Sequence, residues 1–216
     1  MSATAMDNVR SATPGQVRRS PSVPAHWPIR RHVAAAETTP AGPLHSVEVT
    51  VPAKTNLTLH VGPAHEEWGG RHALDTIYCA IGVNDVVTAT AKTPGSGFSL
   101  ELSGEHLGDL ASSGSDMRRN HAVLALFAIA RAAGREPDVA LHVDKHIPVG
   151  AGLGGGSADA AATLLAVNTL WGLHWPIERL RDIAATLGAD MPFCLEGGYA
   201  HGTGFGERII PLEDDS

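Results

Sequence analysis

Cysteine is scarce in this 216-residue chain, in which Cys79 and Cys194 are the only two. Two isolated thiols exclude a disulfide-stapled scaffold, and their spacing does not fit a zinc knuckle. Free thiols are typical of a reducing compartment, so we expect a cytoplasmic protein. Basic residues are also in the minority, with 16 Lys and Arg against 23 Asp and Glu. The resulting charge of −7 argues against a general nucleic-acid binder, which needs a basic surface.

Long apolar runs are missing as well. The longest, 122–130, ends at Arg131 and is too short to cross a bilayer, so we expect no membrane contact. With 43% hydrophobic and 18% charged residues, the composition is nevertheless that of a globular protein with a sizeable core.

Hydrophobic periodicity is absent from residues 1–45, which contain six of the 14 prolines and five arginines against Asp7 and Glu37. Prolines without periodicity cannot build a packed element, so we expect a disordered N-terminal extension. Its Arg- and Ser-rich, acid-poor composition could be a transit peptide, which would direct the protein to a plastid. The alternatives are an unstructured tail or a wrongly chosen start codon.

From Ser46 onward the pattern changes. Val47, Val49 and Val51 alternate with polar residues, which predicts a half-buried strand. Further strands are expected at 57–61, 85–92, 98–102 and 139–143, with a strand pair within 198–212, and helices at 118–133, 157–170 and 176–188. Strands followed by helices predict one α+β domain over 46–212, a mixed sheet packed against helices, and a short tail at 213–216.

The strongest chemical signal is the segment 148–159, PVGAGLGGGSAD, which has five glycines between 150 and 156. Without Cβ atoms, the backbone N–H groups can close around an anion, and the first N–H groups of a following helix add to the attraction. Ser157 offers a hydroxyl there for a phosphate oxygen or a magnesium-bound water. A flexible turn is the alternative, but a turn needs neither five glycines nor a helix start. The segment therefore predicts a phosphate-binding loop.

Neither common nucleotide-binding motif fits this loop. Gly150, Gly152 and Gly155 satisfy G-x-G-x-x-G, but residues 144–148 separate them from the preceding strand, which a dinucleotide-binding unit does not allow. A Walker loop needs G-K-[ST], and no lysine follows the glycines.

Two charged residues are further candidates. Lys54 lies in Pro-Ala-Lys-Thr-Asn-Leu and is one of only three lysines; its ammonium could stabilise negative charge on a reacting oxygen, or it could be a solvated strand end. Asp190 follows the helix terminator Gly188 and precedes apolar residues. It could be a general base or a metal ligand, or it could form an ordinary Asx turn.

Together, the segments 52–57, 148–160 and 187–193 (Leu-Gly-Ala-Asp-Met-Pro-Phe) resemble the GHMP kinase superfamily, in the family's order. The triple glycine and the Lys-x-Asn-Leu strand are most similar to the branch that acts on 4-diphosphocytidyl-2-C-methyl-D-erythritol (CDP-methylerythritol) in the non-mevalonate isoprenoid pathway. The resemblance covers about 47–212. It implies the family's N-terminal ATP-binding domain, with a ribosomal protein S5 domain 2-like fold, and a chain without the family's C-terminal lobe.

The resemblance also implies a kinase that uses ATP and Mg²⁺ to phosphorylate the 2-hydroxyl of CDP-methylerythritol, with Lys54 and Asp190 as the catalytic pair. Asn56 and His72 match substrate-binding positions, and Ser157 would lie close to Mg²⁺. The ATP-binding residues would be Pro148, Val149, Gly150, Ala151, Gly152, Leu153, Gly154, Gly155, Gly156, Ser157 and Ala158.

The chain departs from the family pattern in places. Gly69-Gly70-Arg71-His72 stands where the family has Asp-Gly-Tyr-His, so the stacking tyrosine is replaced by Arg71, whose guanidinium can also stack on a base. Tyr78 could supply an aromatic wall for the substrate instead. Ala158 replaces a common serine. Asn120 matches a position that the family keeps at a helix start, where a helix cap is an equally good explanation.

Three functions therefore remain open at this point: an active CDP-methylerythritol kinase, a catalytically impaired nucleotide-binding remnant of one, or a GHMP kinase for another small alcohol such as mevalonate or homoserine. The sequence indicates no oligomeric state.

Overall fold

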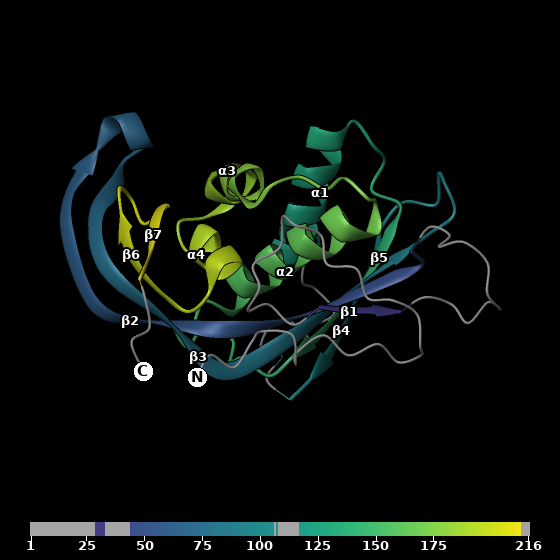
Figure 1. The fold of residues 1–216 in the computed structure, drawn as a ribbon, viewed down its shortest axis with the longest axis horizontal. Helices are drawn as coiled ribbons and strands as arrows, with labels where there is room; N and C mark the ends of the chain where they lie inside the picture. Colours follow the sequence, from purple (N-terminus) through teal and green to yellow (C-terminus); the bar gives the residue numbers. More distant parts are fainter. Residues whose placement is uncertain (1–28, 33–43, 106, 108–116, 213–216) are drawn as a thin grey trace, which may run out of the picture.

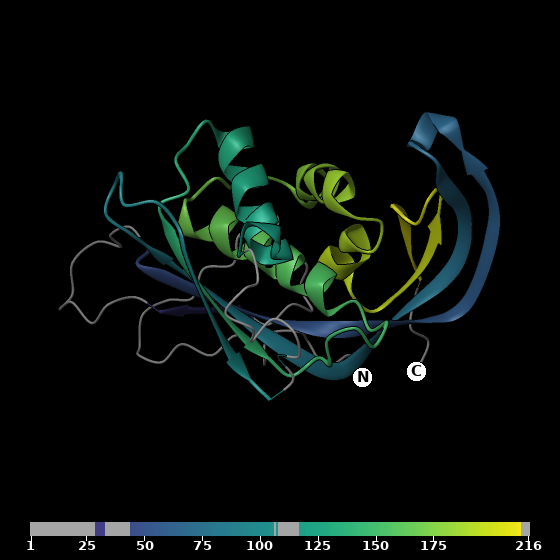
Figure 2. The same ribbon diagram turned by 180° about the vertical axis from the view of Figure 1, so that it is seen from behind.

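The computed structural model describes residues 29–32, 44–105, 107 and 117–212. Within them, seven strands form one sheet, and the helices cover one of its faces (Figure 1 and, from behind, Figure 2). The strands are β1 (Ile29–His32), β2 (Ser46–His65), β3 (Arg71–Ala91), β4 (Ser99–Gly104), β5 (Val139–Lys145), β6 (Tyr199–Thr203) and β7 (Arg208–Leu212). The helices are α1 (His121–Ala133), α2 (Gly155–Leu170), α3 (Ile177–Leu187) and α4 (Met191–Glu196), with 3-10 turns η1 (Glu66–Trp68) and η3 (Met117–Arg119).

The sheet is mixed, as predicted. Its main order is β1-β2-β3-β5-β4, in which β4 and β5 run parallel and the other neighbours antiparallel. β6 pairs with the middle of β3, and β7 pairs with β6. The expected α+β class is therefore confirmed.

β2 and β3 form one long hairpin rather than separate short strands. Register shifts interrupt their pairing at Pro52/Ala53, Asn56/Thr58 and Val61/Ala64. Extra residues of this kind bend and twist a strand pair, and the distal half of the hairpin curls over β6 and β7 (Figure 1). The sequence pattern missed this continuity because the shifts break the period-2 alternation on which strand prediction rests.

α2 is the central helix of the core. It contacts α1, α3 and α4 on its sides and β2 and β3 beneath it, and it is buried from Ala158 to Leu170. A helix that is apolar all round belongs in such a place. α1 buries Val123 and Leu126, whereas Phe127 is exposed and meets the ring of Phe98 edge-on at 5.2 Å.

The helix boundaries have identifiable chemical causes. Asn120 Oδ1 accepts a hydrogen bond from the Ala122 N–H at 2.9 Å, so Asn120 is the N-cap of α1. Gly134 ends α1 in the left-handed conformation. α3 starts after Pro176 and ends before Gly188, as expected from the sequence.

Part of the predicted disordered extension is ordered. Residues 29–32 pair antiparallel with residues 46–49 of β2, whose edge offers unpaired N–H and C=O groups. A strand edge can pair with a segment that has no periodicity of its own. Residues 1–28 and 33–43, and the tail 213–216, lie outside the described residues.

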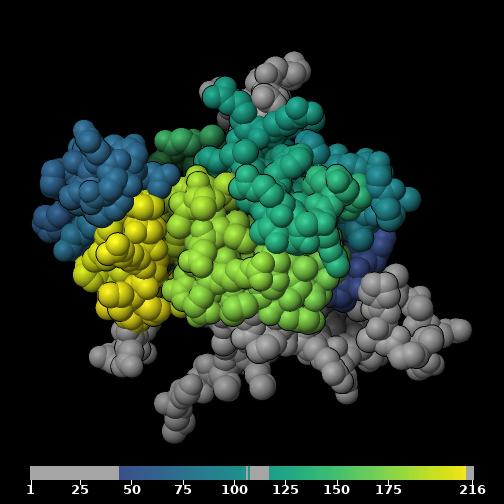
Figure 3. All heavy atoms as spheres, turned by 90° about the horizontal axis from the view of Figure 1, so that it is seen from above, coloured from purple at the N-terminus to yellow at the C-terminus, as the bar shows by residue number. Residues whose placement is uncertain are grey.

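The helical face is shown in Figure 3, where the curled tip of the β2–β3 hairpin stands beside β6 and β7 at one side of the helices. α1 and α3 contact each other on this face. Among the helices of the described part of the chain, none has the length and apolar character needed to cross a membrane.

Candidate active site

Lys54 and Asp190 form an ion pair. Lys54 lies on β2 directly after the first register shift of the hairpin, and Asp190 is the residue before α4. The Lys54 Nζ atom is 3.0 Å from Asp190 Oδ2, with side-chain exposures of 9% and 32%. The carboxylate makes no capping hydrogen bond to α4, so the Asx-turn alternative does not describe it. Its partial exposure leaves it accessible to a ligand.

The ammonium of Lys54 is also tied to its own strand. Its Nζ donates to Asn56 Oδ1 at 3.0 Å, and the Asn56 amide donates to Thr76 Oγ1 at 2.7 Å. The Thr76 hydroxyl donates in turn to the Thr58 carbonyl at 2.6 Å. Because Lys54 and Asn56 are joined in this way, the structure brings together two residues that the sequence assigned to catalysis and to substrate binding.

Tyr78 joins the same cluster. Its hydroxyl donates to Asp190 Oδ1 at 3.1 Å, and its ring stacks on Phe193 with centroids 4.7 Å apart. Tyr78 is fully buried, and burial, with the negative charge of Asp190, raises its pKa far above the ordinary value. The phenol therefore stays protonated and holds the carboxylate by donating to it. The sequence predicted a substrate wall at this position; the structure shows a partner of Asp190.

The glycine-rich loop passes directly beside Lys54. The Lys54 N–H donates to the Leu153 carbonyl at 2.9 Å. Gly154 has φ +70°, and a Cβ there would lie 2.8 Å from Lys54 Cγ. A side chain at this position would therefore push away either the loop or the lysine.

A cavity of about 290 Å³ opens between this loop and the start of α1. It is lined by residues 119–121, 145, 147–156 and 159. The first N–H groups of α1 and α2 lie at its edge, and helix N-termini attract anions. The lining thus includes Pro148 to Gly156 of the predicted ATP-binding residues but neither Ser157 nor Ala158.

The residues present fit a polyphosphate. Gly150, Gly152 and Gly154 have positive φ, so their backbone takes a path that leaves the N–H groups uncovered by side chains. Gly156 lies against the imidazole of His121, and a Cβ would collide with His121 Nδ1. Arg119 adds a positive charge to the cavity wall.

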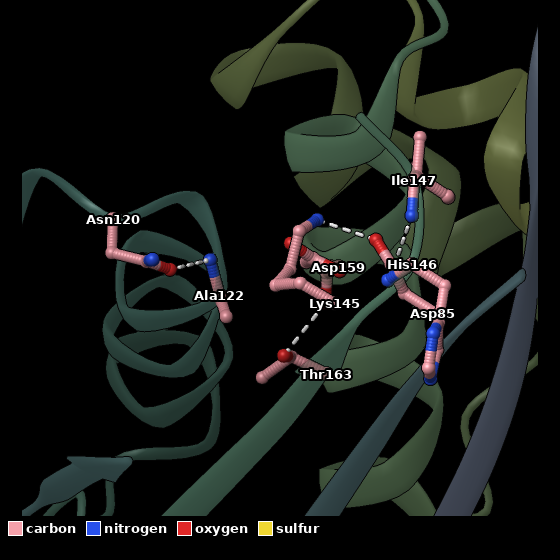
Figure 4. Close-up of polar contacts among 8 residues, drawn as sticks. All are labelled: Asp85, Asn120, Ala122, Lys145, His146, Ile147, Asp159 and Thr163. Atoms are coloured by element: carbon pink, nitrogen blue, oxygen red, sulfur yellow. Dashed lines mark hydrogen bonds and ion pairs between the residues drawn. The ribbon is translucent and has the colours of Figure 1, made fainter. Parts of the chain in front are cut away.

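A buried charged cluster that the sequence analysis did not assign underlies the loop. Lys145 Nζ donates to Asp85 Oδ2 and, at 2.7 Å, to Asp159 Oδ2 (Figure 4). Asp85 Oδ1 accepts from the N–H groups of His146 at 2.6 Å and Ile147 at 2.8 Å. All three charged side chains are at most 4% exposed.

This cluster has one ammonium for two carboxylates. Burial raises the pKa of Asp159 to about 7; Lys145 opposes that rise, and Asp85 adds to it. The two carboxylates raise the pKa of Lys145 despite its burial. Although part of His121 is exposed, burial lowers its pKa, and Lys145 lowers it further. Burial therefore favours the protonated form of Asp159.

A signal for this cluster was present in the sequence. In the strand pattern Val139, Leu141, Val143, the next inward position is Lys145, and on β3 Asp85 shares the inward face with Val87. A charged residue at an inward position is rarely left unpaired, so the pattern predicts a partner for each of these residues.

The distal part of the hairpin holds a separate group. The Arg71 guanidinium lies 4.4 Å from the centroid of Phe205, and the Trp68 ring is 6.1 Å from Phe205. His72 is exposed, with Nδ1 2.9 Å from the Gly62 carbonyl oxygen. No contact joins His72 to the Lys54–Asp190 pair among the described residues. Nor do those residues contain a group of three or more His, Cys, Asp or Glu side chains suited to a metal ion.

Residues 120–198 match the family model described as GHMP kinases N terminal domain. This chain contains a GHMP kinase N-terminal domain. The match spans the start of α1, the glycine-rich loop, α2 and Asp190, and Lys54 lies outside it.

Relatives and solved structures agree with this assignment. The chain is 77% identical over 172 residues to the 4-diphosphocytidyl-2-C-methyl-D-erythritol kinase of Bifidobacterium adolescentis, covering 80% of the chain and 56% of that protein. It is 46% identical over 170 residues to the kinase of the same name from Mycobacterium tuberculosis, and the alignment covers 79% of this chain and 51% of that protein. A crystal structure of 4-(cytidine 5'-diphospho)-2C-methyl-D-erythritol kinase aligns with TM-score 0.59 and 37% identity, covering 76% of the chain and 55% of that structure. A homoserine kinase from Cytophaga hutchinsonii shares the fold, with 19% identity and TM-score 0.60. The alignment covers 82% of this chain and 54% of that structure.

The chain spans about half the length of these curated relatives, 56% of the Bifidobacterium adolescentis protein and 51% of the Mycobacterium tuberculosis protein.

Proposed function

We propose that this domain catalyses transfer of the γ-phosphoryl group of ATP to the 2-hydroxyl of CDP-methylerythritol. The observation that carries the proposal is the contact of Lys54 with two features at once. Its side chain pairs with Asp190 at 3.0 Å, and its backbone N–H bonds to the glycine-rich loop at Leu153. Phosphoryl transfer requires a positioned hydroxyl beside a charge-stabilised phosphate, and this contact puts both requirements in one place.

Asp190 would act on the hydroxyl. Its carboxylate is partly exposed and held by Lys54 on one oxygen and by the Tyr78 hydroxyl on the other. In this position it accepts the hydroxyl proton as the oxygen attacks phosphorus, which is general-base catalysis. Because Tyr78 keeps its own proton, it does not compete for the one that Asp190 receives.

Lys54 would act on developing charge. Its side chain is 9% exposed, so the field of its ammonium is little screened by water, and it lies between Asp190 and the loop. A hydrogen-bond partner on its own strand, Asn56, fixes its direction. Asn56 keeps one amide N–H for a substrate oxygen, since an amide nitrogen carries two and the bond to Thr76 uses one.

The loop 148–156 and the N-termini of α1 and α2 would hold the nucleotide phosphates through backbone N–H groups. When bound, ATP supplies the γ-phosphoryl group that the hydroxyl oxygen receives as ADP leaves. Ser157, in the first turn of α2, would bind Mg²⁺ or one of its waters. The phosphate assignment rests on the fit of the cavity to a polyphosphate, and the assignment of Ser157 rests on the resemblance to the family and on its position in the first turn of α2.

The cytidine end of the substrate would lie toward the hairpin tip. His72 and Arg71 are exposed there, and Phe205, beside which the Arg71 guanidinium lies, is half-buried. A guanidinium that already stacks on one ring offers its other face to a second, which supports Arg71 as a base platform in place of a tyrosine. The cytoplasm is the location that accords with two free cysteines.

Purified chain incubated with MgATP tests the proposal through ADP release that depends on CDP-methylerythritol. Release with that substrate, and inhibition by cytidine diphosphate but not by mevalonate or homoserine, is expected. ATP binding without substrate-dependent release would overturn it in favour of a nucleotide-binding remnant. Release with mevalonate or homoserine alone would overturn the substrate assignment and leave the kinase assignment standing.

A further inference from the structure

The buried cluster of Asp85, Lys145 and Asp159 lies where the two ends of the glycine-rich loop meet. The loop leaves β5 after Lys145, and it enters α2, whose first turns carry Asp159. Lys145 Nζ bridges carboxylates that come from β3 and from α2 (Figure 4). A single ammonium therefore connects the entrance of the loop to its exit.

The Asp85 side chain accepts backbone hydrogen bonds just beyond the end of the β3–β5 pairing. The β3–β5 ladder stops at the pair Val86 and Asp144. Beyond it, the N–H groups of His146 and Ile147 donate to Asp85 Oδ1 rather than to a backbone carbonyl. A side chain thus substitutes for the missing ladder bonds and sets the direction in which the chain leaves the sheet.

The loop exit is packed tightly on the same atoms. A Cβ on Gly155 would lie 3.2 Å from Lys145 Nζ and 3.1 Å from Ile147 Cγ2. Beyond Gly155, the Ala158 N–H donates to the Gly154 carbonyl at 2.8 Å, and the Leu153 carbonyl accepts from Lys54. A shift of Lys145 would therefore be transmitted to the segment that borders both the cavity and the ion pair.

One acceptor atom of the cluster has no hydrogen-bond partner among the described residues. Asp159 Oδ1 is buried and has no hydrogen-bond partner among the described residues. The charged or titratable groups that act on Asp159 are Lys145 from β5 and Asp85 from β3. His121 of α1 lines the same cavity, and the charge of Lys145 lowers its pKa. The charge of Asp159 raises the pKa of Cys194 on α4. Both Lys145 and Asp159 contribute to the cavity lining.

We propose that Asp85, Lys145 and Asp159 form a clamp that holds the two ends of the glycine-rich loop at a fixed separation, and that Lys145 and Asp159 are positioning residues for the bound polyphosphate. The inference rests on the proposed function only for the identity of the ligand. The clamp itself is a property of the free protein, so it can be tested without any ligand.

Two variants distinguish loss of the Lys145–Asp159 hydrogen bond from loss of the negative charge on Asp159. Asp159→Asn keeps the size of the side chain and one acceptor for Lys145 but removes the negative charge. At pH 8, above the raised pKa of Asp159, Lys145→Met with Asp159→Asn removes one charge of each sign, so it keeps the net charge of the cluster and breaks the bridge. Asp144→Asn is the matched control, because Asp144 precedes Lys145 on β5 but bonds to Ser103 and His146 outside the cluster.

The first readout is amide hydrogen exchange measured by NMR on the nucleotide-free protein. We expect exchange at the His146, Ile147 and Ala158 amides to be at least tenfold faster in the double variant, with the Ile129 amide of α1 unchanged. Equal acceleration at Ile129 would mean general destabilisation and would overturn the clamp, as would wild-type exchange at all four amides. Where the double variant does not fold, the same comparison on Asp159→Asn decides.

The second readout is MgATP affinity measured by calorimetry. We expect binding about tenfold weaker in the double variant and unchanged in Asp144→Asn. Wild-type affinity in the double variant would overturn the positioning role. If the unmodified chain binds no MgATP, the proposed function fails, and the exchange data still decide whether the clamp exists.

Discussion

The Lys54 ammonium and the Asp190 carboxylate are 3.0 Å apart, although β2 carries the first and the turn before α4 carries the second. The hairpin and α4 contact each other directly, which brings the two residues to one point beside the glycine-rich loop. Four expected outcomes follow from this arrangement and from the groups around it.

Loss of either member of the pair is expected to abolish turnover and leave nucleotide binding nearly intact. A general base typically contributes roughly 10²–10⁴-fold to rate, so Asp190→Ala and Lys54→Ala should each lower ADP release by that order. ATP affinity, measured by calorimetry, should change little because the loop holds the phosphates. Lys92→Ala, at the far end of β3, is the control. A variant of either residue that turned over at the wild-type rate would remove its assigned role.

Tyr78→Phe is expected to reduce turnover without unfolding the protein. The change removes the hydrogen bond to Asp190 Oδ1 but keeps the ring that stacks on Phe193. A hydrogen bond to a charged group contributes roughly 1.5–3 kcal/mol, so kcat should fall about tenfold or more. Steady-state kinetics check the fall in kcat, and a thermal melt checks that the protein stays folded. An unchanged kcat would show that Asp190 needs no such support.

Gly202→Ala is expected to destabilise the fold through Tyr78. A Cβ at this β6 position would collide with Tyr78 Cε2, and the tyrosine ring is fully buried against Phe193. Overpacking of this kind typically costs roughly 1–3 kcal/mol. Gly82→Ala on β3 is the matched control, because a Cβ there meets nothing within 4 Å. Urea unfolding should separate the two variants, and equal midpoints would contradict the packing.

The stability of the protein is expected to fall as pH rises through the acidic range. The folded state raises the pKa of Asp159 to about 7, whereas an unfolded Asp titrates near 3.9, so between these values the folded state binds more protons. The free energy of unfolding should therefore drop by roughly 2–3 kcal/mol between pH 5 and 8 because of this group.

Denaturant unfolding of Asp159→Asn tests that expectation, since its stability relative to the unmodified protein should improve over the same interval. The stability of Asp144→Asn relative to the unmodified protein should show no trend between pH 5 and 8, because the hydrogen bond from Ser103 lowers the pKa of Asp144 and its contribution changes only in more acidic solution. Parallel curves for Asp159→Asn and the unmodified protein would mean that Asp159 is ionised throughout.

Local sequence patterns were sufficient for elements whose causes are local. Asn120, Pro176 and Gly188 mark helix ends because capping geometry depends on neighbours a few residues away. The apolar sequence of α2 predicts a buried helix, and the five glycines before it predict an anion-binding loop. By contrast, the continuous β2–β3 hairpin and the pairing of Ile29–His32 depend on partners distant in the chain.

The sequence by itself determined the residue types of the site: a lysine, an aspartate, and a backbone bare enough to surround phosphate. Only the tertiary structure decided their partners. It paired the Tyr78 hydroxyl with Asp190, and it joined Asp85, Lys145 and Asp159 beneath the loop. The physical reason is that the period of a strand predicts which side chains face inward, whereas the partner each charge finds there depends on how distant segments pack.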